Sequence, residues 1–115
     1  MVFHQAIIRV RAGSRLDRGG NTVADWSPEN VDRLTVGRVS VQPIMQSETA
    51  TPERTAAVTG WRVISEPGVD ADIRYNDRIE WDGMTLEIVG EVARYLDFVH
   101  STPHHIEFAM RRKTG

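Results

Sequence analysis

The chain contains no cysteine, a single lysine and no long run of hydrophobic residues. Without thiols it can form neither a disulfide framework nor a thiolate metal site, which suits a reducing cytosol or a particle assembled there. No stretch approaches membrane-spanning length, and the N-terminal "MVFHQAIIRVRAG" is interrupted by His4, Gln5 and Arg9, so it lacks the apolar core of a signal peptide. We therefore expect a soluble protein without a membrane partner.

An excess of positive charge is also missing, since the net charge is −2. A protein that coats nucleic acid needs an electropositive face, so the charge balance argues against that class. Because Lys113 is the only lysine, the other basic residues are arginines, which suit bidentate pairing with carboxylates in interfaces. With 115 residues and 40% hydrophobic content, we expect one domain over residues 1–115 with one core.

What the sequence does contain is period-two alternation, which is typical of half-buried β-strands. In "AIIRVRAG" we expect Ile8 and Val10 on the buried face and Arg9 and Arg11 on the outer face. The runs "VGRVSVQP", "AVTGWRVIS" and "HHIEFAMRRK" alternate in the same way, and "GGN" predicts the turn of a hairpin before them.

The segment "DRIEWDGMTLEIVG" predicts a second hairpin, because Asp82 and Gly83 are a favoured pair for a two-residue type I′ turn. That turn fixes the register and so decides which side chains share a face. The expected apolar face consists of Ile79, Trp81, Met84 and Leu86, with Glu80 and Glu87 on the other face.

Short strands separated by turn residues, without a long helical pattern, indicate an all-β fold. We expect a small antiparallel β-barrel of about six or seven strands with one long polar loop at about residues 43–57. Gly37 is a candidate bulge, Gly60 a candidate site of close backbone approach, and one helical turn after Ser27 is the most that we expect.

Candidate catalytic and metal-binding groups are few. His100, His104 and His105 could suggest a metal site, but Pro103 disrupts the helical spacing and adjacent histidines on a strand point oppositely. Paired carboxylates would need a buried cleft, and the sequence has no nucleophile elbow, phosphate-binding glycine loop or zinc-protease motif. We therefore expect no enzyme, no cofactor and no metal. The acids considered are Asp70, Asp72, Asp77, Glu80 and Glu87.

Aromatic residues raise the alternative of a nucleic-acid-binding barrel, in which bases stack on exposed rings. The candidates are Trp26, Trp61, Trp81, Tyr75, Tyr95 and Phe108. Trp61 and Trp81 fall on the apolar parity of their strands, so core packing explains them, and the acidic balance lacks a matching electrostatic groove.

The segment from Pro43 to Ala57 has no apolar periodicity, and loops of this length in compact domains are usually functional or disordered. Its threonines and acids can bind water or a partner but cannot bury enough apolar area to fix it alone. A surface loop with no task remains the alternative interpretation.

In order and spacing, the "DRGGNTVADW" hairpin, "SVQP", the polar loop, "DRIEWDGMTLEIVGE" and the terminal "HHIEFAMRRK" resemble the head-to-tail stopper (head-completion) proteins of long-tailed bacteriophages. The resemblance covers nearly the whole chain, and none of its motifs is catalytic. It implies a virion protein of the neck, assembled in the bacterial cytoplasm as a hexameric ring. The adaptor and portal would lie above it, the tail terminator and tail below it, and packaged double-stranded DNA in its channel.

In this family a long loop between two barrel strands points into the channel and helps to retain DNA. The matching residues are Gln46, Ser47, Glu48, Thr49, Thr51, Pro52, Glu53, Arg54 and Thr55. Arginines expected on the outer faces of the first and last strands are candidates for intersubunit or adaptor contacts: Arg9, Arg11, Arg111 and Arg112. Ordinary solvated faces are the alternative interpretation of these four residues. A tail terminator-like connector protein is the alternative within the same class.

Overall fold

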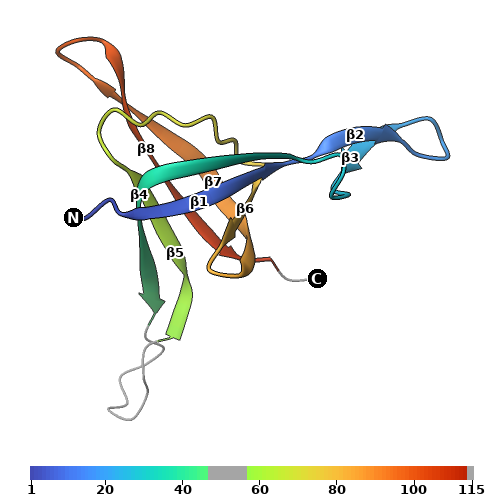
Figure 1. Cartoon of the computed structure of the whole chain (residues 1–115), viewed down its shortest axis with the longest axis horizontal. Helices are drawn as coiled ribbons and strands as arrows, with labels where there is room; N and C mark the ends of the chain where they lie inside the picture. The colour runs from blue at the N-terminus through green and yellow to red at the C-terminus, as the bar shows by residue number, and fades with distance from the viewer. Residues whose placement is uncertain (47–56, 114–115) are drawn as a thin grey trace.

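The computed structural model describes residues 1–46 and 57–113, and no helix occurs among them. The strands are β1 (Gln5–Arg11), β2 (Gly13–Leu16), β3 (Thr22–Asp25), β4 (Asp32–Gln46), β5 (Ala57–Ser65), β6 (Arg78–Trp81), β7 (Met84–Asp97) and β8 (Thr102–Arg112). Six of them form a closed barrel in the order β1-β4-β5-β8-β7-β6 (Figure 1). All strand pairs are antiparallel, which confirms the predicted fold class.

The barrel closes because β1 pairs with β4 on one side and with β6 on the other. Closure removes the free edges that short half-buried strands would otherwise present to other chains. Strands β2 and β3 form a separate two-stranded sheet that extends away from the barrel (Figure 1). Between β3 and β4 the chain makes a single turn, in which the amides of Asn30 and Val31 bond to the carbonyl of Ser27.

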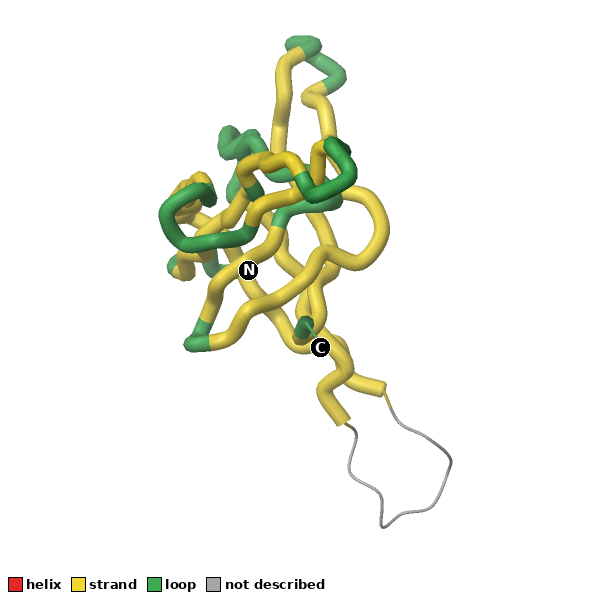
Figure 2. Tube along the Cα trace, turned by 90° about the vertical axis from the view of Figure 1, so that its right-hand side faces the viewer, coloured by secondary structure: helices red, strands yellow, loops and turns green. Residues whose placement is uncertain are grey.

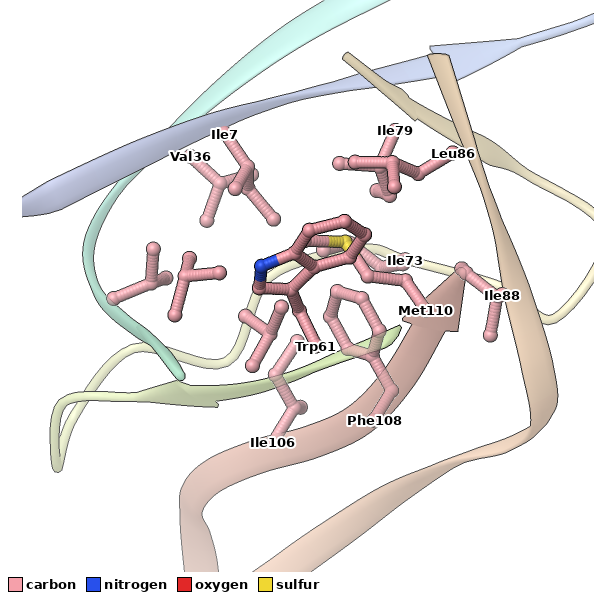
Figure 3. Packing of buried hydrophobic residues seen from close by; sticks show 13 residues of the cluster. Ile7, Val36, Trp61, Ile73, Ile79, Leu86, Ile88, Ile106, Phe108 and Met110 are labelled. Atoms are coloured by element: carbon pink, nitrogen blue, oxygen red, sulfur yellow. The ribbon is translucent and has the colours of Figure 1, made fainter. Parts of the chain in front are cut away.

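The core consists of alternate side chains that point into the barrel. Strand β8 contributes Ile106, Phe108 and Met110, each at most 2% exposed, as its sequence pattern predicted. Trp61 of β5 lies among them in the middle of the cluster, beside Phe108 (Figure 3). Burying side chains of this size stabilises a fold by about 1.5–3 kcal/mol each, so the β5–β8 pair is central to the stability of the barrel.

The β6–β7 hairpin has the predicted register, with Trp81 opposite Met84 and Ile79 opposite Leu86. Asp82 and Gly83 both have positive φ, 50° and 73°, as a type I′ turn requires. Asp and Gly tolerate this conformation, and its twist matches that of the flanking strands.

The prediction for β1 was wrong for Ile8 and for the two arginines, although Val10 is buried, 6% exposed, as expected. Ile7 and Arg9, 1% and 3% exposed, lie on the inner side, whereas Ile8 faces outward with Ala6. The local pattern is ambiguous because apolar residues occur on both faces of this strand. The observed choice lets the arginines meet acids of the segment between β5 and β6, a contact that alternation within one strand does not encode.

Strand β4 is longer than expected and continues through Pro43 to Gln46, so the predicted loop begins later than its predicted start. Proline is tolerated there because β1 last pairs with β4 at Val39, which leaves the other edge of β4 free. The bulge predicted at Gly37 is confirmed, since the β1–β4 register shifts there and Arg38 has a φ of 57°.

Candidate functional site

The candidate site is the β4–β5 arm, defined here as residues 43–46 of β4 and 57–60 of β5. The two strands pair with each other from Val39 opposite Ser65 to Gln46 opposite Ala57. Strand β5 pairs with β8 only over Trp61–Ile64, so the arm extends beyond the barrel as a two-stranded ribbon (Figure 1). An isolated ribbon of this kind is marginally stable in water, and the barrel therefore anchors the arm.

Gly60 marks the point where the arm leaves the barrel. A Cβ at this position would lie 2.6 Å from the carbonyl oxygen of Met110, which is closer than real Cβ contacts come. The close backbone approach predicted for Gly60 is therefore confirmed. It lets the end of β8 cross the base of the arm, where Trp61 pairs with Met110.

The surface of the arm is more apolar than the sequence suggested. Ile44, Met45 and Val58 are 36%, 54% and 42% exposed, and none of them belongs to the barrel core. Thr59 donates its hydroxyl to the carbonyl of Ile44 at 3.3 Å, across the ribbon. Exposed apolar side chains on a projecting element are typical of a contact surface rather than of a simple connection.

Of the predicted channel residues, only Gln46 lies in a described element, as the last residue of β4. The remaining residues predicted for the channel lie outside the described residues: Ser47, Glu48, Thr49, Thr51, Pro52, Glu53, Arg54 and Thr55.

The interface predicted for Arg9 does not fit its position, because its side chain is 4% exposed. Its guanidinium forms an ion pair with Asp32 and donates Nη1 to the carbonyl of Asp72 at 3.0 Å. Nε has no hydrogen-bond partner among the described residues. Arg9 is thus an internal residue that links β1 to the beginning of β4 and to the segment before β6.

Arg11 is also directed inward, with a side chain that is 22% exposed. It donates Nε and Nη2 to the two carboxylate oxygens of Asp77, each at 2.9 Å, and Nη1 to Asp72 at 2.9 Å. The hydrogen bond from Arg11 lowers the pKa of Asp72, although that carboxylate remains in solvent. The pair of Arg11 with buried Asp77 links β1 to the segment before β6.

Arg111 and Arg112 are exposed near the end of β8, as predicted. Arg111 pairs with Glu87 at 2.8 Å across the β7–β8 pair. The guanidinium of Arg112 lies 5.3 Å from the ring centroid of Trp61, and its Nε is 3.4 Å from the sulfur of Met84. These two arginines remain accessible for contacts, whereas the two on β1 are engaged internally.

The acids considered as catalytic pairs are each paired with an arginine. Besides the Arg11 pairs, the structure has Asp70 with Arg94 at 3.1 Å, Glu80 with Arg33 at 2.9 Å and Glu87 with Arg111 at 2.8 Å. An arginine therefore lies beside each of these carboxylates.

Three of the four histidines, His100, His104 and His105, lie in the β7–β8 hairpin. The Nδ1 atoms of His104 and His105 are 2.7 Å apart, and the ring of His105 stacks on Tyr95 at a centroid distance of 4.6 Å. His100 bonds instead to Asp97 at 2.9 Å, in the turn. Within residues 1–46 and 57–113, no group of three or more histidine or acidic side chains is arranged to hold a metal ion.

The tryptophans do not form a stacking platform. Trp61 belongs to the core, is 9% exposed, and meets the partly buried Trp81 edge to face with centroids 5.6 Å apart. Trp26 lies outside the barrel, but the guanidinium of Arg78 covers its ring at 3.7 Å. A base would have to displace these contacts in order to stack.

Sequence reasoning missed Arg94, which ties the segment before β6 to β7. Its guanidinium donates to the carbonyls of Ile73 at 2.6 Å and Ala71 at 3.1 Å. The buried Ile73 is held in the core partly by this contact. No local pattern marks such a residue, since its partners are backbone carbonyls distant in the sequence.

A scan against protein-family models finds no match, and a search of curated proteins finds none either. In the described part of the chain, no helix is long and apolar enough to cross a membrane. The fold and the arm thus define the structural class of the protein, which is an all-β barrel with a projecting two-stranded ribbon.

Proposed function

We propose that this protein is a structural component of a bacteriophage head–tail connector, namely a head-to-tail stopper. In this function several copies form a ring below the portal and adaptor, close the DNA channel and provide the surface to which the tail attaches. The full-length resemblance in motif order and spacing supports the proposal, and the closed barrel is compatible with it.

The observation that carries the proposal is the β4–β5 arm. Its strands leave the barrel as a pair, and residues 47–56, which connect them, include all of the predicted channel residues except Gln46. An element of this kind can carry a polar segment toward a channel axis while the barrels pack around it. Acids and hydroxyls in that segment would bind phosphates weakly, which suits a closure that must later let DNA pass.

Two features of the structure would suit a subunit of a ring. The barrel provides a rigid body, because its Arg9, Arg11 and Arg94 contacts fix the segment between β5 and β6. Arg111 and Arg112 lie exposed at the end of β8, where an acidic surface of a neighbouring connector protein could pair with them.

Cryo-electron microscopy of the source particle tests the proposal directly. We expect the barrel as a ring in the neck, between the adaptor and the tail terminator, with the arm directed toward the channel. Density for this chain at the level of the tail terminator would identify it as a terminator-like protein instead. Density outside the neck, or absence from the particle, would overturn the proposal.

A further inference from the structure

The β7–β8 hairpin extends beyond the barrel at the end opposite the β4–β5 arm (Figures 1 and 2). Within it the two strands lose their regular register, since Tyr95 pairs with His105 but the next residue of β7, Leu96, pairs with Pro103. His104 is therefore an extra residue on β8, which makes a β-bulge, and a bulge re-aims the side chains beside it. The expectation that the adjacent histidines point in opposite directions was wrong for this reason.

The bulge brings the rings of His104 and His105 into direct contact. Their Nδ1 atoms are 2.7 Å apart and their ring centroids are 4.9 Å apart. At this distance the two nitrogens share a hydrogen bond, in which one Nδ1 donates its proton and the other accepts it with a lone pair. If both Nδ1 atoms carried a proton, two N–H groups would face each other and repulsion would replace the hydrogen bond.

Glu107 and Tyr95 fix the orientation of His105. The Nε2 atom of His105 lies 3.2 Å from a carboxylate oxygen of Glu107, and its ring stacks on that of Tyr95 with an angle of 3° between the planes. Because an ionised carboxylate only accepts hydrogen bonds, Nε2 of His105 is the donor. In the neutral pair, Nδ1 of His105 is thus the acceptor and Nδ1 of His104 is the donor.

The histidine pair can hold one additional proton but not two. With one added proton, one ring becomes an imidazolium and the other still supplies a lone pair, so the hydrogen bond between the Nδ1 atoms persists. With two added protons, both rings are imidazolium ions, neither Nδ1 has a lone pair, and the rings must separate. The contact therefore exists only while at least one of the two rings is neutral.

The acids around the histidine pair are already engaged with other groups. Glu107 contacts the pair, but its other carboxylate oxygen lies 3.7 Å from Arg62 of β5. Asp97, at the end of β7, interacts electrostatically with His104 but bonds to the ring of His100 at 2.9 Å. The acids of the segment that follows β5 are paired with arginines: Glu66 with Arg38 and Asp70 with Arg94. A second positive ring would therefore have to compete for these carboxylates.

The backbone of the two histidines anchors the segment between β5 and β6, residues 66–77, which we call the strap. The amide of Gly68 donates to the carbonyl of His104 at 2.7 Å, and Val69 forms a parallel β-bridge with His105. The strap thus passes beside the bulge of the β7–β8 hairpin (Figure 1). A change in the bulge therefore acts directly on the first residues of the strap.

We propose that His104 and His105 form a pH-sensitive switch, which anchors the strap to β8 while at least one ring is neutral and loosens it when both rings are protonated. Histidine is the side chain whose charge commonly changes between about pH 5 and 8, so the switch responds to mild acidification. The anchoring is present at the higher pH and is lost as the pH falls, because the separated rings no longer hold the bulge. The switch goes beyond the connector function and does not depend on it, since every group involved belongs to this chain.

Amide hydrogen exchange of the unmodified protein, followed by NMR, gives the first test. We expect the protection factor of the Gly68 amide to fall by about 10-fold between about pH 7 and about pH 5, as the loss of its hydrogen bond predicts. A protection factor is a ratio to the exchange rate of the unfolded chain, so it removes the intrinsic effect of pH. The amides of β6 are the internal reference and should keep their protection. Constant protection of Gly68 would overturn the proposal.

The ¹⁵N chemical shifts of the imidazoles report the protonation state of each ring nitrogen in the same sample. While Gly68 is protected, we expect one of the two Nδ1 atoms to be unprotonated and Nε2 of His105 to carry a proton. The protection of Gly68 should fall together with the protonation of the second ring. Protonation of both rings with Gly68 still protected would contradict the switch, and so would loss of protection while one ring remains neutral.

His104→Asn separates the histidine pair from other groups that respond to acid. The asparagine amide can donate through its nitrogen or accept through its oxygen, so it suits either form of His105. We expect Gly68 in this variant to be equally protected at both pH values. His100→Asn is the matched control, because His100 lies in the same hairpin but bonds to Asp97, and it should retain the pH response.

A pH response in His104→Asn as large as in the unmodified chain would assign the effect to other groups and overturn the proposal. Loss of the response in His100→Asn would do the same. The measurement on the ring nitrogens needs no variant, so it decides the proposal even where a substitution disturbs the bulge.

Discussion

Gly60→Ala tests whether the base of the arm is built on close contact between backbones. The added carbon would lie 2.6 Å from the carbonyl oxygen of Met110, and that oxygen belongs to the backbone of β8, so it cannot move as a flexible side chain can. Trp61, next to Gly60, pairs with Met110, so relief of the clash would disturb the core around the indole.

The magnitude follows from two opposing effects. Overpacking of a close contact costs about 1–3 kcal/mol. Replacing glycine with alanine gains about 0.4–1 kcal/mol because the unfolded chain loses conformational freedom. We therefore expect Gly60→Ala to lower the free energy of unfolding by about 1–2 kcal/mol, which lowers the Tm by roughly 5 °C or more in a domain of this size.

Gly37→Ala is the matched control. A Cβ at Gly37 would meet nothing within 4 Å, and the residue does not have a positive φ. The unfolded-state gain should therefore remain, and we expect this variant to be as stable as the unmodified chain or slightly more stable. Denaturant titration followed by tryptophan fluorescence measures both. Equal stability of the two variants would refute the proposed role of Gly60.

Three further predictions concern charge and the polar segment. Asp77→Ala should lower the free energy of unfolding by about 3 kcal/mol, because it leaves Arg11 without its buried partner. Asp70→Ala, which breaks an exposed pair, should lower it by less than about 1 kcal/mol. Similar losses for the two variants in urea titration would contradict this difference between buried and exposed pairs. Hydrogen bonds from the hydroxyl and amide of Ser27 lower the pKa of Asp25 below the ordinary value of 3.8, and hydrogen bonds from His100 and Val99 lower the pKa of Asp97. The two ionised carboxylates therefore contribute stability above pH 3.8, and this stability is lost as the pH falls through their lowered pKa values. Asp25→Asn should therefore reduce the acid-induced fall in Tm, and an unchanged pH profile would count against this explanation. Deletion of Ser47–Thr55 should leave the circular dichroism and Tm of the barrel nearly unchanged but cause filled heads to lose DNA in a nuclease-protection assay; normal retention would contradict a channel role.

The fold class and several local details could be predicted from sequence because they depend on neighbouring residues. The Asp82–Gly83 turn sets its own register, and Ile106, Phe108 and Met110 alternate without ambiguity. The face of β1 could not be predicted in the same way. Both parities of "AIIRVR" carry apolar residues, and the choice depends on Asp72 and Asp77, more than sixty positions away.

The candidate site was predicted less completely, for a related reason. The polar composition identified the segment after Gln46, but it did not show that β4 continues past Pro43 in pairing with β5. Proline is accommodated there because β1 no longer pairs with that part of β4. The exposure of Phe98 and Val99 at the β7–β8 turn was missed altogether, since in a sequence they look like ordinary core residues. Exposure at this turn depends on how far β7 and β8 extend beyond the barrel, and only the pairing of the strands shows that.

The reversed face of β1 also determines what the outer surface of the barrel presents, because it places Ala6 and Ile8 in a groove on that surface. If Ile8 and Val10 had faced inward, the outer surface would carry Arg9 and Arg11 and would lack an apolar groove. With the arginines inside, Val10 is covered and 6% exposed, while Ala6 and Ile8 remain at the groove. Burying guanidinium groups is costly unless they are paired, and here Asp32, Asp72 and Asp77 pair with the two arginines and hold the segment between β5 and β6 on the barrel. The outward position of Ala6 and Ile8 follows from this exchange, because alternation along the strand places them outside when the arginines lie inside.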